Sequence, residues 1–444
     1  MSVTTLSTSA LLEAALATSP ADATEFILTD AQEDLTRFGD NAITQNVSKR
    51  VRSLSVRIQH QGREARVDTT QLHEAGVRQA IADAMRLAAL QEADPAMMLM
   101  LEGPQTYRTL PDRGMRDGTP EDRATHAELA VRLCEEAGAR AAGISAQTRT
   151  HVIVLNSRGV RAEGTTQRCE YSVTADKDDG SGWAKQVVSN PDLIDSEAIA
   201  RRAVDKALAS RHHRPLAPGH YPVVLEAAAV ADLVRMFPWM AFNALDYLEG
   251  RHFALDRVGE RFFDPKLTIV DDIVEVPGLP FDYEGVPRQR VPLIEEGRFV
   301  GLVHDRSTAA RAGVAPTGHG GPAPNPYGAY ASHLVVSPGV AREEDLVRGM
   351  KSGLLVTQLH YLNVVDRMDL SITGMTRSGT FWVENGEIAY PVENMRFTDS
   401  LIHLLGSIDA LSRDREWAAA FWEGTSLAPA MRLPRMHFSS PAGF

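Results

Sequence analysis

The first ninety residues alternate between apolar and polar positions in the way that β-strands do. The pattern is clearest at Leu54, Val56 and Ile58, which point to one face while the polar residues between them point to the other. A short helix is predicted before these strands, over residues 7–18. A longer amphipathic helix is predicted after them, over 72–93, because apolar residues recur there at intervals of three and four. This region therefore predicts antiparallel strands covered by a helix.

The next region mixes strands and helices without the alternation of a βαβ fold. Residues 95–120 are rich in proline, glycine and methionine and predict a connector, and the acids Glu121 and Asp122 predict the start of a helix after it. Two alternating segments follow, joined by a hairpin turn at 156–159, and a further helix is predicted over 196–211. The order strands, helix, helix, hairpin, strand and helix predicts an α+β arrangement.

Residues 211–219, rich in arginine, histidine and proline, form the clearest predicted linker in the chain. One strand and then an amphipathic helix over 228–250 are predicted after it. Beyond that helix the pattern predicts short strands separated by glycine and proline, with hairpin turns at 295–298 and 384–387 and one late helix over 398–414. The second half therefore predicts a β-rich domain.

Together these elements predict an α+β fold. Its N-terminal α/β domain consists of antiparallel strands with covering helices, and its C-terminal domain is mostly antiparallel β with one long helix at its start. A chain of 444 residues is too long for one ordinary core. We therefore predict a strand-helix domain at 1–95, a helix-hairpin-helix region at 96–214 and a β-rich domain at 215–444.

Composition narrows the functional classes. Hydrophobic residues make up 43% of the chain and charged residues 23%, which is ordinary for a soluble globular protein. The net charge of −12 argues against a sequence-independent nucleic-acid binder. No apolar run is long enough to span a membrane, and the first residues lack the basic start of a signal peptide. The two cysteines, Cys134 and Cys169, predict free thiols in a reducing cytoplasm, with a disulfide or a single thiolate ligand as alternatives.

Fourteen histidines invite a metal hypothesis, but their spacing does not support one. Two histidine ligands on one helix need a spacing near four residues, and neither HExxH nor HExxxH occurs in the sequence. His73-Glu74 resembles the head of such a motif, but Val77 and Arg78 stand where a second histidine is needed, so we interpret this dipeptide as a helix start. His212-His213 lies in the linker and predicts solvated side chains.

Other candidate chemistry is confined to short polar segments. No phosphate-binding glycine loop and no GxSxG nucleophile turn is present in the sequence. Residues 317–322 form a glycine-rich loop, which is either a plain turn or a set of amides able to hold an anion or a peptide carbonyl. Asp271, Asp272, Asp282 and Glu284 lie near a predicted strand end, where carboxylates either bind cations and substrate amines or simply cap loops.

Four motifs occur in order in the second half of the chain. They are D-x-E-G at Asp282–Gly285, H-D-x-x-T-A at His304–Ala309, T-G-x-G at Thr317–Gly320, and GTFWVENGEIAYPV from Gly379 to Val392. In this order they resemble the C-terminal half of the TldD/PmbA family, and the N-terminal strands and helix resemble the family's first domain. The resemblance therefore spans nearly the whole chain. It departs from the family in a short C-terminal tail and in Met375–Ser378, which replaces a G-D-(F/Y)-S-like run.

This resemblance implies a heterodimeric protease in which one subunit holds zinc on a helix that reads H-E-x-x-x-H-G-L-E-G, the glutamate acting as general base. Aligning Leu248–Gly250 with the end of that pattern places Ala241 and Phe242 at the His-Glu positions and Asp246 at the second histidine. The family's later cysteine ligand is missing from the tail at 422–444. Because amide hydrolysis by zinc needs about three protein ligands, we expect no metal or other cofactor in this chain and zinc in a homologous partner.

The leading hypothesis is therefore a subunit of the PmbA (TldE) type, paired as a heterodimer with a zinc-bearing TldD-like homologue and acting on small or unfolded peptides. Exposed strand edges of the β-rich domain are expected to bind an extended peptide through backbone hydrogen bonds. The residues predicted to bind substrate are Asp282, Glu284, Gly285, Thr317, Gly318, His319 and Gly320.

Two alternatives remain. One is a homodimer that performs metal-free chemistry on a small molecule or a modified peptide, with Asp246, Glu249, His252 or His304 as acid or base. The other is a peptide-binding scaffold without chemistry. All three hypotheses share a cytoplasmic protein that binds neither nucleic acid nor a membrane.

Overall fold

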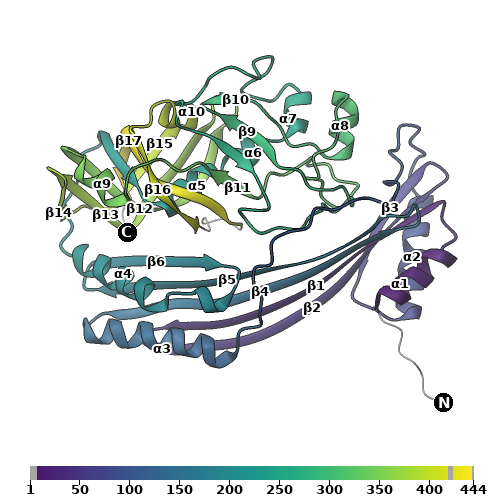
Figure 1. Cartoon of the computed structure of the whole chain (residues 1–444), viewed down its shortest axis with the longest axis horizontal. Coiled ribbons are helices and arrows are strands. Elements are labelled where there is room, and N and C mark those ends of the chain that lie inside the picture. The colour runs from purple at the N-terminus through teal and green to yellow at the C-terminus, as the bar shows by residue number, and fades with distance from the viewer. Residues whose placement is uncertain (1–7, 419–423, 443–444) are drawn as a thin grey trace.

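Two β-sheets organise the chain, and the long strands of the first run beneath the second (Figure 1). The computed structural model describes residues 8–418 and 424–442. The predicted α+β class is confirmed by this arrangement. Within the described ranges, no helix combines the length and the apolar character that a membrane crossing requires.

The first sheet has six strands among the described residues, in the spatial order β3-β2-β1-β4-β5-β6, and neighbouring strands are antiparallel. The strands are β1 (Ala23–Gly39), β2 (Ala42–His60), β3 (Arg63–Thr69), β4 (Arg140–Asn156), β5 (Arg161–Lys177) and β6 (Gly180–Val188). The parts predicted at 1–95 and 96–214 thus contribute three strands each to one sheet. The predicted turn at 156–159 joins β4 to β5, as expected.

Two pairs of helices pack on one face of this sheet, at opposite ends of its long strands. The helices are α1 (Thr8–Thr18), α2 (Glu74–Ala89), α3 (Pro120–Glu136) and α4 (Ser196–Ala209), and a short 3-10 turn (Pro191–Leu193) precedes α4. Phe26 and Leu28 of β1 pack with α1 and α2, whereas Phe38 packs with α3 and α4. These three residues occupy even positions of β1 and so share a face. The alternation seen in the sequence therefore separates the helix-covered face from the opposite face, where Ile27 of β1 packs with Phe281.

Local predictions in this part are confirmed at the level of single atoms. His73 precedes α2, and its Nδ1 accepts a hydrogen bond from the backbone N–H of Gly76 at 3.1 Å, so the His-Glu dipeptide is a helix start. Cys134 and Cys169 are both free and buried. Burial raises the pKa of each thiol to about 11. Neither thiol is activated as a nucleophile in this environment.

The second sheet has 11 strands among the described residues and is mostly antiparallel; only the pairs β7–β12 and β11–β17 run parallel. The strands are β7 (Gly219–Leu225), β8 (Ile269–Asp271), β9 (Val291–Glu295), β10 (Arg298–Phe299), β11 (Leu334–Val336), β12 (Ser352–Asp366), β13 (Ser371–Glu384), β14 (Glu387–Pro391), β15 (Met395–Ser400), β16 (Ala410–Ala418) and β17 (Ser426–Pro441). The turns expected at 295–298 and 384–387 join β9 to β10 and β13 to β14.

The single helix expected over 228–250 is instead divided. The structure has α5 (Ala227–Val234), α6 (Phe237–Met240) and α7 (Ala244–Leu248). Pro238 lacks the backbone N–H that a continuous helix would bond four residues back, so α5 ends before it. Asn243 is extended, and its side-chain oxygen accepts a hydrogen bond from the N–H of Leu245 at 3.0 Å, which starts α7. Periodicity therefore predicted helical structure in this segment but not the breaks.

The late helix expected over 398–414 is also mostly absent. The remaining helices of this half are α8 (Arg306–Ala312), α9 (Glu343–Arg348) and α10 (Leu401–Leu405). Only α10 is helical in the expected range, because the flanking residues pair as β15 and β16 with β17. Tertiary strand pairing overrides the helical periodicity of this segment.

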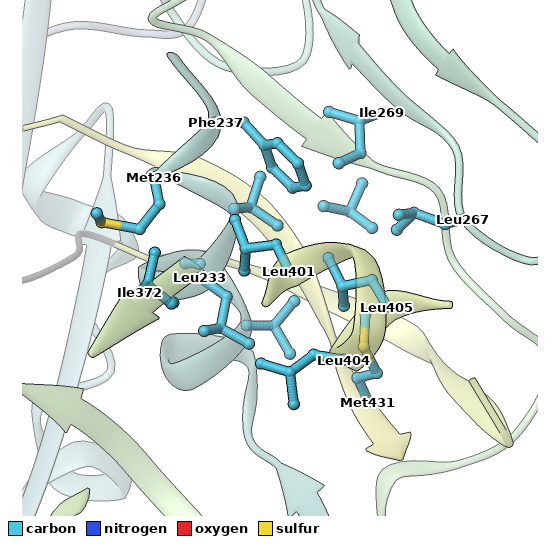
Figure 2. Packing of buried hydrophobic residues seen from close by; sticks show 14 of the residues in the cluster. Leu233, Met236, Phe237, Leu267, Ile269, Ile372, Leu401, Leu404, Leu405 and Met431 are labelled. Carbon is cyan, nitrogen blue, oxygen red and sulfur yellow. The ribbon is translucent and has the colours of Figure 1, made fainter. Parts of the chain in front are cut away.

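The largest hydrophobic core cluster includes residues of α5 and α6. Figure 2 shows Leu233 and Phe237 packing with Leu401, Leu404 and Leu405 of α10. All five side chains are buried. The divided helix segment is therefore part of the hydrophobic core that supports the second sheet.

Candidate functional site

Two residues between α6 and α7 occupy the positions that the zinc motif gives to its first histidine and its glutamate. Both have structural roles. The N–H of Ala241 donates to the carbonyl of Phe237 at 2.7 Å. The ring of Phe242 is buried and stacks with the rings of Phe237 and Phe299, whose centroids lie 5.1 and 6.4 Å away. Both residues thus belong to an aromatic core and offer no side-chain ligand.

Asp246, the third of these positions, is held by arginines. Its two carboxylate oxygens lie 3.0 Å from Arg251 and 3.3 Å from Arg367. The exposed Glu249 also pairs with Arg251, so the structure brings these two predicted acid-base candidates together through a shared cation. Both carboxylate oxygens of Asp246 are therefore engaged in ion pairs.

His252 follows α7 and is completely buried. Its Nε2 donates to the carbonyl of Ala241 at 2.6 Å, and its Nδ1 accepts from the N–H of Ala254 at 3.1 Å. Burial lowers the pKa of this imidazole, so the ring is neutral and fixed as one tautomer. His252 therefore stabilises the turn after α7, and no space around it admits a substrate.

His304, the fourth candidate, lies apart from the other three, just before α8. Its N–H donates to the Thr317 hydroxyl at 2.8 Å, and that hydroxyl donates back to the His304 carbonyl at 3.0 Å. Burial lowers the pKa of the His304 imidazole. The structure thus joins this residue to the glycine-rich loop that the sequence singled out separately.

The D-x-E-G turn holds the glycine-rich loop through backbone hydrogen bonds. One oxygen of Asp282 accepts from the N–H groups of Glu284 and Val286, each at 2.9 Å, and the other accepts from the N–H of Gly320 at 2.7 Å. A Cβ on Gly320 would lie 2.5 Å from Glu284 Oε2 and 3.0 Å from Asp282 Oδ2. The approach of both carboxylates therefore requires a glycine at this position.

Both carboxylates of this turn are buried, and burial raises their pKa values. That of Asp282 rises to about 6, against the opposing effect of the three backbone N–H groups. That of Glu284 rises to about 8, first through burial and then through the nearby charge of Asp282, although the N–H of Arg306 donates to it at 3.0 Å. At neutral pH Glu284 is therefore mostly protonated.

A third buried carboxylate, Asp271, contacts the same loop. Its Oδ1 lies 3.1 Å from His319 Nε2, while His319 Nδ1 lies 3.0 Å from the Thr317 carbonyl. Burial lowers the pKa of the His319 imidazole, and the neighbouring Asp271 carboxylate opposes that shift. Burial alone would raise the pKa of Asp271, but the neighbouring His319, with His333 and Arg288, holds it well below its usual range.

The sequence analysis did not predict two of the residues that contact Asp271. Arg288 Nη1 lies 3.9 Å from its Oδ1, and the N–H of His333 donates to its Oδ2 at 2.9 Å. His333 comes from the loop before β11, far along the chain, and only the fold brings it here. The adjacent Asp272 instead caps a turn by accepting from the N–H of Val274 at 2.8 Å. Of the two interpretations of the acid pair, Asp271 contacts basic side chains, whereas Asp272 caps a loop and also lies 3.3 Å from Arg290.

The D-x-E-G turn and the loop lie where the two sheets meet. The Tyr107 hydroxyl donates to the carbonyl of Gly285 at 2.9 Å. Arg66 of β3 donates to the carbonyl of Ala323 at 2.6 Å, and Arg306 donates to the carbonyl of Leu99 at 2.8 Å. All the predicted substrate-binding residues except Thr317 are buried here. These residues fix the contact between the two sheets, and substrate binding by them stays a prediction.

Across residues 8–418 and 424–442, no group of three or more His, Cys, Asp and Glu side chains has an arrangement suited to a metal ion. The tail position expected for a cysteine ligand lies partly in residues 422–423 and 443–444, outside the described ranges.

The chain matches two domain models of one protein family. Residues 218–440 match the PmbA/TldA metallopeptidase C-terminal domain, and residues 119–211 match the PmbA/TldA metallopeptidase central domain. The two matches meet at the linker between α4 and β7.

Individual relatives agree with this match. The chain is 24% identical to the metalloprotease PmbA of Escherichia coli O157:H7 over 398 residues, which cover 86% of this chain and 85% of that protein. It is 24% identical to a zinc metalloprotease TldD homologue of Saccharolobus solfataricus over 290 residues, 60% of this chain and 61% of the relative. The crystal structure of TldE from Thermococcus kodakarensis has the same fold, with a TM-score of 0.85 at 20% identity over 97% of this chain and all of that one.

Replacing Asp271 with asparagine is expected to destabilise the fold by about 3–5 kcal/mol, because the buried His319 and Arg288 lose their counter-charge. Urea unfolding followed by circular dichroism measures this loss. Asp205→Asn, on the exposed face of α4, is the matched control and should change stability by less than about 0.5 kcal/mol. Equal stability of the two variants would show that the Asp271 ion pair is not needed.

Glu284→Gln is expected to gain stability relative to the wild type as the pH rises. The native pKa of about 8 lies above the unfolded value of 4.5, so the wild type binds a proton on folding and loses that stabilisation as pH rises through this window. Glutamine is neutral throughout. The difference in melting temperature should therefore grow by at least about 3 °C between pH 5 and pH 9.

Glu128→Gln, on the exposed face of α3, serves as the control for this titration and should show no such trend. A difference between Glu284→Gln and the wild type that stays constant with pH would contradict the protonated state of Glu284.

Proposed function

The chain belongs to the PmbA/TldD metallopeptidase family, and on this basis we propose that it is the subunit of a two-chain zinc peptidase that does not itself hold the metal. A homologous partner with an HExxxH helix supplies the zinc and the general base. This chain completes the enclosure in which small or unfolded peptides are cleaved.

The proposal rests on the roles of the three residues that stand where the zinc motif has its two histidines and its glutamate. Ala241 and Phe242 serve the aromatic core, and Asp246 is paired with two arginines. A zinc ion needs neutral imidazoles or free carboxylates facing a common point. These residues do not fit that requirement, so no hydrolytic step is assigned to them.

The contribution of this chain is then recognition. β14 is hydrogen-bonded to β13 alone among the described strands, and its Ile388 is half exposed. The linker residue Arg214 covers only the end of the other edge of β14, where the N–H of Arg214 donates to the Pro391 carbonyl at 2.9 Å. Such an edge accepts an extended peptide as an additional strand, through backbone hydrogen bonds that tolerate many sequences. The half-buried Thr317 gives the glycine-rich loop its point of contact with a peptide.

The purified chain is expected to contain less than about 0.1 zinc atom per molecule by elemental analysis, because it lacks the ligand set that structural or catalytic zinc requires. Cleavage of an unstructured peptide is expected only after mixing with an HExxxH homologue from the same genome. The control is that homologue with its motif glutamate changed to glutamine, which should bind this chain but leave the mixture inactive.

Stoichiometric zinc in the chain alone would overturn the proposal. Peptide turnover by the chain alone, without metal, would instead favour the alternative of metal-free chemistry. Binding of peptide without turnover in any mixture would favour a scaffold.

A further inference from the structure

A cavity of about 350 Å³ is lined in part by residues of β13 and of the segment after β14. Figure 1 shows β13 and β14 at the other end of the second sheet from α7. The walls of the cavity come from both halves of the chain. The turn between β5 and β6 contributes Asp179 and Ser181, and the linker after α4 contributes His213. The second sheet contributes Ser378 of β13 and Glu393, which follows β14. The cavity is separate from every residue used in the proposed function.

The backbone is strained where β13 reaches this cavity. Ser378 has φ of 55° and the following Gly379 has φ of 121°, and the pairing of β13 with β12 shifts register at this point. A serine with positive φ has a higher conformational free energy than a serine in the ordinary strand conformation. The bulge places the Ser378 side chain in the wall of the cavity.

Ser378 is 7% exposed as a whole residue, so it is more than nine-tenths buried. Among the described residues, 8–418 and 424–442, its hydroxyl has no hydrogen-bond partner, and the residue lines the cavity. A hydroxyl of so buried a residue normally has a partner. The unpaired hydroxyl in a strained bulge therefore points to a ligand as its partner.

The charge of the lining indicates the kind of ligand. Asp179 and Glu393 contribute carboxylates, and no lysine or arginine is among the described residues that line the cavity. The N–H of His212 donates to both oxygens of Asp179 at 3.0 Å, which lowers the pKa of that carboxyl and keeps it ionised. Glu393 accepts from the N–H of Leu216 at 3.0 Å and keeps its second oxygen for another donor. Asp179 Oδ2 also lies 3.4 Å from Nδ1 of His213, which lines the cavity too. With two carboxylates and one histidine, the lining still offers acceptors and negative charge.

We propose that this cavity binds a small primary ammonium compound. An ammonium group has three N–H donors, which match the carboxylates of Asp179 and Glu393 and the Ser378 hydroxyl. The volume lies at the low end for ligand pockets and suits a diamine or a dipeptide. This inference goes beyond the proposed function, because binding an amine requires neither a zinc-bearing partner nor peptide hydrolysis.

The test is isothermal titration calorimetry of the full chain with four probes. Putrescine supplies a free amine, alanyl-alanine amide supplies a peptide amino terminus, and N-acetyl-alanyl-alanine amide and butanediol are the uncharged counterparts. We expect one or both amines to bind and neither uncharged probe to bind. Binding of putrescine alone identifies a free amine as the ligand, and binding of the dipeptide amide alone identifies a peptide amino terminus.

Variants locate the binding. Asp179→Asn should weaken the amine at least about tenfold and Ser378→Ala about fivefold. Asp178→Asn is the matched control, because Asp178 is the adjacent acid, pairs with Arg211 and does not line the cavity. It should change affinity less than about twofold.

Two results would overturn the inference. One is that neither amine binds the full chain. The other is that Asp178→Asn weakens binding as much as Asp179→Asn, which would mean a general surface charge effect. Ser378→Ala alters no charge, so it keeps the test decisive even if Asp179→Asn disturbs the turn that holds His212.

Discussion

The burial of carboxylates where the two sheets meet is the constraint on which the rest of the structure depends. A buried carboxylate costs free energy unless it is protonated, hydrogen-bonded or paired. Asp282 takes three backbone N–H groups, Glu284 retains a proton, and Asp271 pairs with His319. In each case the groups involved belong to the glycine-rich loop or to the D-x-E-G turn that faces this loop. The loop is therefore fixed by the way that buried charge is neutralised.

This arrangement separates two kinds of polar site. At the junction between the sheets, Asp282 accepts from three backbone N–H groups and Glu284 retains a proton, so these two carboxylates stabilise the fold. At the cavity beside β13, the Ser378 hydroxyl is unpaired among the described residues and two carboxylates face the same space. Acceptors that face a cavity are what a binding site needs, whereas groups satisfied within the protein are what a domain contact needs.

The segment at α6 and α7 shows how a metal position becomes part of a core. A ligand must point its polar atoms at a common centre, and a core residue must bury apolar surface. Phe242 fulfils the second requirement by stacking between two rings. The backbone around it bends at Pro238 and Asn243, which a regular helix of ligands would not permit. The segment keeps its place in the fold with a different physical role.

The sequence by itself determined what depends on local periodicity and on ordered motifs. The α+β class, the strand turns, the helix start at His73 and the family were all predicted from it. The tertiary structure alone decided that both ends of the 398–414 segment form strands, and which residues are the partners of Asp271. The reason is that these features depend on contacts between residues far apart in the chain, such as Asp271 with His333, which no local pattern records.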